Sequence, residues 1–189
     1  MSKLGFCILQ LLLAPWLYTM PINAYAQCPQ PDVKEVKVYG NNVQFVFTTV
    51  EQMQASETVL TGQSRVVLRF RMCDSNTPYS RWVLHVKSLD DMLYLNGGST
   101  ADDAIALNKV EIIATINTQS NNHFITISSP LSLSTTPKVL AEGQLDISAP
   151  TVNDVMEAEL LLSYKLTEQA WGRKSGIYLA NLHLQLDAL

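Results

Sequence analysis

Histidine is the side chain that most often transfers protons or binds metals near neutral pH, and the sequence holds three. His85, His123 and His183 occur in no His-x-x-x-His or His-Glu-x-x-His spacing, and no cysteine stands beside any of them. Zinc sites on one element need such spacing because their ligands must share a face. We therefore expect three solvated histidines, on outward strand faces or in loops, and no metal site.

Hydroxyl and carboxylate groups are the other reactive groups of the chain. "TISSPLSLSTT" is rich in serine, but no Gly-x-Ser-x-Gly motif is present. A Ser-His-Asp arrangement assembled from distant strands stays open, because geometry and not sequence order defines a triad. Asp90-Asp91 and Asp102-Asp103 flank Asn96-Gly97-Gly98 and could bind calcium, yet their spacing matches no calcium loop. Turn chemistry explains these acids more simply, so we expect no catalytic residue and no cofactor.

Three aromatic residues are the candidate ligand contacts. Tyr79, Tyr94 and Trp171 lie in or beside expected connections, where binding residues concentrate and where a ring can stack on a sugar. Trp171 opens "WGRKSG", a polar turn with two adjacent cations, Arg173 and Lys174. The alternative for Trp171 is packing over the open end of the fold.

The first 26 residues have the composition of a secretory signal peptide. Lys3 is followed by an apolar run from Leu4 to Trp16, and Ala24-Tyr25-Ala26 forms a cleavage site before Gln27. A membrane anchor is the alternative, but Gln10 and two prolines interrupt the stretch, which falls short of the about 20 apolar residues of a spanning helix. We predict cleavage, no membrane span in the mature chain and one domain over residues 27–189.

The compartment decides how the cysteines are interpreted. Cys7 leaves with the signal peptide, and Cys28 and Cys73, 45 residues apart, remain for an oxidising destination where such a pair usually joins. We predict one disulfide. The net charge of −4 and the absence of any Lys/Arg block argue against a nucleic-acid or anionic-membrane partner.

The mature sequence has the period of two that is typical of half-buried strands. Apolar residues alternate with polar ones through the expected strands, which are 33–39, 43–47, 64–73, 81–88, 109–117, 124–127, 154–166 and 177–186. Trp82 is the best candidate for the centre of the core. In the strand 64–73, the row Arg65, Arg69 and Arg71 is expected to face water.

Two regions are expected to be irregular. The segment 89–108 is predicted to be a long connection, and 128–150 a loop region in which 144–148 forms a short edge strand. A helix is the alternative for 155–162, although alternation through Tyr164 favours a strand. The short turn before the last strand predicts that this strand pairs with 156–164 and completes its own core, so that a free edge lies elsewhere. No βαβ rhythm is visible, so we predict an all-β, two-sheet antiparallel sandwich of seven or eight strands.

The order of these signals resembles the Ig-like secreted domains of bacterial surface fibres, of the spore coat protein U and fimbrial-subunit type. The matching residues are Ser163, Tyr164 and Leu166 at the end of one strand, then Gly176 and Tyr178 at the start of the last. The resemblance implies an Ig-like sandwich and an exported structural or adhesive role. Fibre subunits of this type carry an extra donor strand before the first cysteine, whereas predicted cleavage here leaves only Gln27 before Cys28. The resemblance therefore fits a chain that accepts a strand or acts alone better than a shaft subunit.

The sequence thus predicts a non-enzymatic, exported structural or adhesion protein in the periplasm, at the cell surface or outside the cell. Other secreted or surface proteins are its expected partners. A carbohydrate-binding module that uses the loop aromatics is the alternative hypothesis.

Overall fold

The computed structural model describes residues 33–71, 81–97, 103–121, 123–145 and 155–189, which are almost entirely β-structure. The first elements are β1 (Val33–Tyr39), β2 (Asn42–Phe47), the short helix α1 (Val50–Gln54), β3 (Thr58–Arg71), β4 (Arg81–Ser88), β5 (Met92–Leu95) and β6 (Ile105–Ala106). A 3-10 turn, η2 (Leu107–Lys109), precedes β7 (Val110–Gln119), β8 (His123–Ile127), β9 (Leu131–Ser132), β10 (Lys138–Leu145), β11 (Val155–Leu166) and β12 (Gly176–Ala188). No helix in these ranges is long and apolar enough to cross a membrane.

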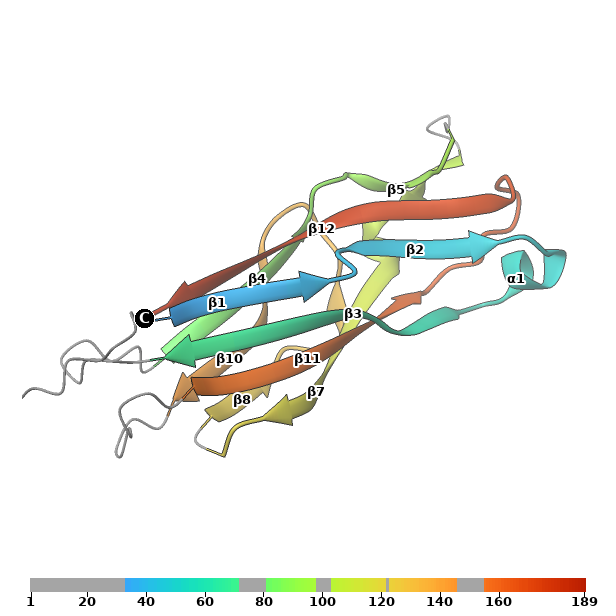
Figure 1. Cartoon of the computed structure of the whole chain (residues 1–189). Coiled ribbons are helices and arrows are strands. Elements are labelled where there is room, and N and C mark those ends of the chain that lie inside the picture. The colour runs from blue at the N-terminus through green and yellow to red at the C-terminus, as the bar shows by residue number, and fades with distance from the viewer. Residues whose placement is uncertain (1–32, 72–80, 98–102, 122, 146–154) are drawn as a thin grey trace, which may run out of the picture.

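The strands form two antiparallel layers (Figure 1). One sheet has the order β1-β3-β11-β7-β9, and the other has the order β6-β5-β12-β4-β10-β8 with β2 also paired to β12. The all-β antiparallel architecture expected from the alternating pattern is therefore confirmed. Several short strands are present in addition to the seven or eight expected.

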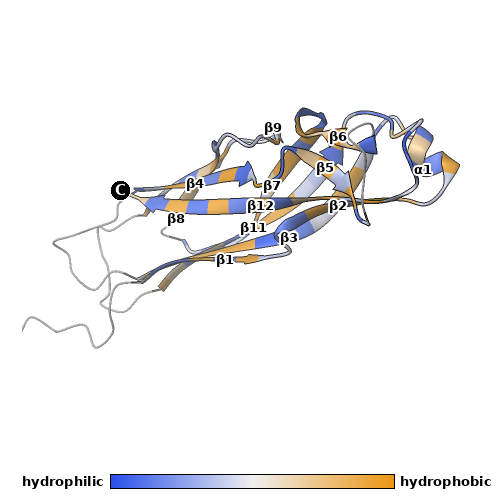
Figure 2. Ribbon diagram, turned by 90° about the horizontal axis from the view of Figure 1, so that it is seen from above, coloured by the Kyte–Doolittle hydropathy of each residue, from blue (hydrophilic) through white to orange (hydrophobic). Residues whose placement is uncertain are grey.

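The core lies between the two layers and is made by the inward residues of the long strands. Colour bands alternate along these strands in Figure 2, as the period of two requires. The largest fully buried side chains are aromatic: Phe45, Phe47, Phe70, Trp82, Tyr164 and Tyr178. The strand expected at 154–166 is present as β11, whose inward row from Met156 to Leu166 is buried.

The last two strands do not pair with each other, which corrects the expected terminal hairpin. β11 lies between β3 and β7, whereas β12 lies in the other sheet beside β4, β2 and β5. The connection after Leu166 therefore crosses from one layer to the other. β11 buries one whole face and β12 most of one face because these faces meet across the core and not because the strands are neighbours.

The two regions expected to be irregular contain regular structure. β5 and β6 interrupt the predicted connection, and β10 is a full strand between β4 and β8, not a short edge strand. The sequence pattern does not reveal β10, because Gly143 interrupts its apolar positions. The ideal Cβ of an alanine at Gly143 would lie 2.0 Å from the Cε2 atom of Trp82, the residue opposite in the ladder. The missing side chain of Gly143 thus leaves the space into which the ring of Trp82 packs.

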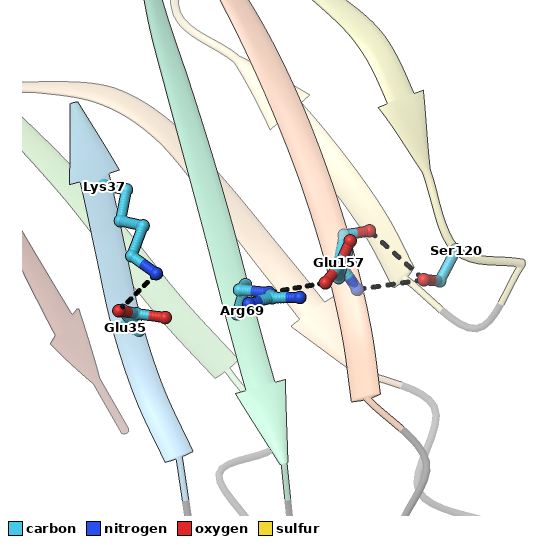
Figure 3. A network of polar contacts seen from close by, with 5 residues as sticks. All are labelled: Glu35, Lys37, Arg69, Ser120 and Glu157. Carbon is cyan, nitrogen blue, oxygen red and sulfur yellow. Dashed lines mark hydrogen bonds and ion pairs between the residues drawn. The ribbon is translucent and has the colours of Figure 1, made fainter. Parts of the chain in front are cut away.

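The outer face of the first sheet is neutralised by ion pairs between strands (Figure 3). The Nε of Arg69 on β3 lies 2.5 Å from Oε1 of Glu157 on β11, and the Nε of Arg65 lies 2.7 Å from Oε2 of Glu159. Ser120 joins the network through hydrogen bonds with the backbone of Glu157. Arg65 and Arg69 face outward as expected, but paired with acids, and the side chain of Arg71 lies outside the described part.

Candidate functional site: an open margin between β1 and β12

Two strands of different sheets run beside each other without pairing, and they define the candidate site. Among the described strands β1 pairs only with β3, and β12 pairs with β2 only up to Asn181. From His183 to Ala188, β12 pairs with β4 on one side and with no described strand on the other. We call these two facing edges, residues 33–39 and 183–188, the open margin.

The chain creates this margin by changing sheets between β1 and β2. Gly40, at φ 69°, forms the turn, and the next residue, Asn41, accepts a hydrogen bond of 2.8 Å from the N–H of Leu182. Beyond that bond β1 departs with β3 while β12 continues along β4. Figure 2 shows the two strands separating toward the carboxyl-terminal end, opposite the end that carries α1.

A buried polar cluster fixes the turn at which the strands part. The hydroxyl of Ser64 on β3 donates to the carbonyl of Gly40, and its oxygen lies 2.5 Å from the hydroxyl of Tyr164 on β11. Burial raises the pKa of Tyr164 to about 12, so the phenol is neutral throughout the physiological range. A Cβ at position 40 would meet the carbonyl oxygen of Gln63 at 2.5 Å, so glycine is required there for both space and φ.

The backbone of β12 offers to the margin hydrogen-bonding groups that pair with no other described strand. In an antiparallel ladder, successive residues point their N–H and C=O groups to opposite sides. Leu189 bonds to Arg81 on the β4 side, whereas the N–H of Leu182 points the other way to Asn41. Leu184, Leu186 and Ala188 therefore direct their backbone groups away from β4 and into the margin.

The side chains that line the margin are apolar and incompletely covered. Val36 and Val38 of β1 and Leu184 of β12 are half-buried against the core, whereas the inward residues of the central strands are almost fully buried. Lys34 follows the same alternation as Val36 and is exposed. Within the described residues the margin therefore combines unpaired backbone groups, partly covered apolar surface and a cation on the inward row, which is the chemistry of a sheet edge that can take another strand.

An aromatic cluster lies directly behind the margin and includes one of the predicted histidines. Phe70 is the ladder partner of Lys34 on β1, and Trp82 is the ladder partner of Ala188 on β12. Their rings stack with centroids 5.9 Å apart, and the ring of His123 meets both edge-on. Together they fill the core between the two strands of the margin.

The expectation that His123 is solvated is wrong, because its side chain is fully buried. The Nε1–H of Trp82 donates to its Nε2 at 2.7 Å, and its Nδ1 has no hydrogen-bond partner. Burial lowers the pKa of His123 to about 4, and the backbone of Glu157 acts weakly in the opposite direction. The spacing could have revealed this burial. His123, Ile125 and Ile127 stand at every second position, so the histidine lies on the same inward face as the two isoleucines.

The other two histidines lie nearer the surface. His183 is exposed, as expected. His85 is half-exposed and its Nδ1 lies 3.2 Å from Oδ2 of Asp187. No group of three or more His, Cys, Asp or Glu side chains in the described residues could hold a metal ion.

Trp171 lies at the opposite end of the molecule from the margin, on a loop held by many contacts. Its side chain is 61% exposed. Nζ of Lys174 lies 2.7 Å from Oδ2 of the buried Asp103, and this bond raises the pKa of Lys174. Arg173 donates to the carbonyl of Ala104 and pairs with Glu168 at 3.1 Å. The loop therefore presents an exposed indole on a fixed support.

The remaining predicted residues divide into structural acids and residues outside the described ranges. Oδ2 of Asp90 accepts the N–H of Asn181 at 2.5 Å, and the hydroxyl of the exposed Tyr94 donates to Asp91. This bond raises the pKa of Tyr94. The predicted Cys28, Cys73, Tyr79 and Asp102 all lie outside the described residues.

Comparison with known proteins gives no family for this chain, so the interpretation of the open margin rests on its geometry. No protein-family model matches the sequence. No curated protein shows significant similarity to it.

Proposed function

We propose that the chain is an exported, non-enzymatic structural or adhesion module with an Ig-like sandwich, and that it joins a cell-surface assembly by accepting a β-strand at the open margin. The observation that carries this proposal is the pair of facing edges on β1 and β12, unpaired with any further described strand, whose Val36, Val38 and Leu184 are half-buried against the core. Free strand edges are templates for a further strand, and apolar pockets along them select alternating side chains. The partner is an extended segment of another exported protein.

The margin also sets the chemistry of that segment. Its inward side chains must be apolar to cover Val36, Val38 and Leu184. Lys34 sits at the end of the same row and is exposed, so a carboxylate opposite it complements the charge. A helix or a flat protein surface would leave the backbone groups of Leu184, Leu186 and Ala188 unpaired.

Site-specific photo-crosslinking in the producing cells tests this proposal. A photoreactive phenylalanine analogue is placed at Leu184, which is half-buried in the margin, or at the adjacent Gln185, which is exposed on the outer face of the same strand. We expect one discrete adduct from position 184 and none from position 185. Mass spectrometry should map the adduct to an alternately apolar segment of another exported protein.

Hydrogen exchange on the isolated complex supplies the second measurement. The amides of Leu184, Leu186 and Ala188 should exchange more slowly in the complex than in the free chain, because a paired strand protects them. Equal adducts from positions 184 and 185, or an adduct without amide protection, would contradict strand acceptance.

A carbohydrate-binding role is the second candidate, and the exposed indole of Trp171 favours it. An indole held on a fixed loop can stack on a pyranose ring with little loss of conformational entropy. If this role is correct, the full-length chain binds a glycan array and Trp171→Ser abolishes binding, while Tyr39→Ser, which removes an exposed ring from β1, has no effect. Identical array profiles for the wild type and Trp171→Ser would exclude Trp171 as a sugar contact.

A further inference from the structure

The hydrogen bond between Trp82 and His123 defines the protonation state of a buried imidazole. An indole N–H can only donate, so the Nε2 of His123, 2.7 Å away, must be the unprotonated acceptor. The neutral ring then carries its proton on Nδ1, which is buried without a partner. A second proton has only Nε2 to bind, and there it would oppose the N–H of Trp82.

We propose that His123 is an acid-sensitive lock on the core behind the open margin: uptake of one proton at Nε2 breaks its bond to Trp82 and loosens the packing between β3 and β4. Its effect on strand acceptance rests on the function proposed above. Neutral pH keeps the lock closed, and acidification opens it.

Among the described residues, only the backbone of Glu157 favours an imidazolium at His123, and its effect is smaller than that of burial. Phe70 of β3 and Trp82 of β4 contribute rings, and Leu145 of β10 is the ladder partner of His123. From β11 only the backbone of Glu157 adjoins it, because the carboxylate is paired with Arg69 on the outer face.

The charged residue nearest to the cluster along β1 is a cation and cannot serve as a counter-ion. Lys34 is the ladder partner of Phe70 and carries a positive charge on the inward side of β1. A proton on His123 would therefore meet the cost of desolvation with no counter-ion among the described residues. The low pKa, about 4, agrees with this geometry.

The position of the cluster connects the lock to the margin. Phe70 adjoins β1 through Lys34, and Trp82 adjoins β12 through Ala188, so these two rings support the strands on either side of the margin. When His123 is charged, Trp82 loses its hydrogen-bond acceptor and both rings pack against a hydrated cation. The distance between the two edges is then no longer fixed for an incoming strand.

NMR titration of the full-length chain tests the lock without any partner. The chain has three histidines, and the variants His85→Gln and His183→Gln, both outside the core, assign the ring signals by elimination. We expect the His123 signal to remain that of the neutral ring until close to pH 4, and Trp82→Phe to raise its pKa because the neutral form loses its donor. Titration of His123 near the ordinary value of about 6.5 would overturn the proposal.

Crosslinking at position 184 over a range of pH then tests the coupling. In the wild type the yield should fall by about tenfold between pH 7 and pH 3, because at pH 3 a group with a pKa of about 4 stays neutral in only about one chain in ten. In His123→Gln, whose amide oxygen can still accept from Trp82, it should change little. An equal fall in both proteins contradicts the coupling, whereas absence of crosslinking at every pH contradicts the proposed function and leaves the NMR result to decide the lock.

Discussion

At the scale of single residues, the contact between Trp82 and Gly143 shows how one missing side chain shapes the core. Trp82 is 1% exposed although it is the largest side chain in the sheet. It lies flat over Gly143 of the neighbouring strand, where any Cβ would overlap the indole. The indole of Trp82 fills the space that a side chain at position 143 would otherwise occupy, so each residue requires the other.

Gly143→Ala is therefore expected to destabilise the protein by about 1–3 kcal/mol, because the methyl group displaces Trp82 from its place beside His123. Urea unfolding measures this change. Gly62→Ala is the matched control, since no atom lies within 4 Å of a Cβ there and only the φ of 61° opposes it. It should cost about 1 kcal/mol and leave the fluorescence of Trp82 unchanged. A fluorescence spectrum unaltered by Gly143→Ala would contradict this account.

The buried imidazole also predicts how stability depends on pH. The pKa of His123 is about 4 in the folded chain against 6.5 for the free side chain, so the unfolded state binds the proton more readily. The stabilisation that neutral His123 gives the folded state is complete above pH 6.5. It declines as the pH falls from 6.5 to 4, and the loss levels off below pH 4. The wild type should lose about 3 kcal/mol across this interval relative to His123→Gln. Parallel urea-midpoint curves for the two proteins would show that His123 does not titrate in this way.

At the scale of elements, the hinge between β1 and β2 is held by one short polar chain. Gly40, Ser64 and Tyr164 join the turn to the two central strands of the first sheet. Tyr164→Phe removes a hydroxyl but leaves the bond from Ser64 to Gly40. We expect a loss of about 1 kcal/mol in unfolding free energy, the usual net value of a buried hydrogen bond.

The matched control for this change is Ser64→Ala, which removes both bonds and leaves the carbonyl of Gly40 and the hydroxyl of Tyr164 without their partner. It should cost more than Tyr164→Phe and speed amide exchange at Asn41 and Leu182, where β1 and β12 part. Equal effects of the two substitutions would place the stabilisation in Tyr164 and not in the turn.

At the scale of the whole molecule, the ladder between β1 and β3 supports the predicted disulfide. The ladder ends with Val33 opposite Arg71, so the segments that contain Cys28 and Cys73 leave these strands at the same end of the molecule. If the bond forms, the intact mass of the exported chain is lower by two hydrogen atoms until it is reduced. In the loop-entropy model, Cys28→Ser with Cys73→Ser costs about 4 kcal/mol. Two free thiols in protein isolated from its natural compartment would refute the pairing.

Much of the fold was predictable because strand patterns are local. Residues such as Val66, Leu68 and Phe70 alternate with Arg65 and Arg69 within one segment, and this alternation alone defines which side is buried. β10 was less visible because Gly143 has no side chain to contribute to the pattern. Of the candidate site, the inward faces of β1 and β12 were predictable, but not their proximity.

The sequence by itself determined most of the long strands, most of their buried faces and the all-β class, because a period of two needs no knowledge of other segments. Only the tertiary structure decided that β11 and β12 belong to different sheets. A strand can bury its apolar face whether the next strand in the sequence lies beside it in the same sheet or across the core in the other sheet. It also decided that β1 and β12 face each other unpaired and that His123 is enclosed by Phe70 and Trp82. Those facts depend on which strands meet, and the periodicity of a strand does not encode its neighbour.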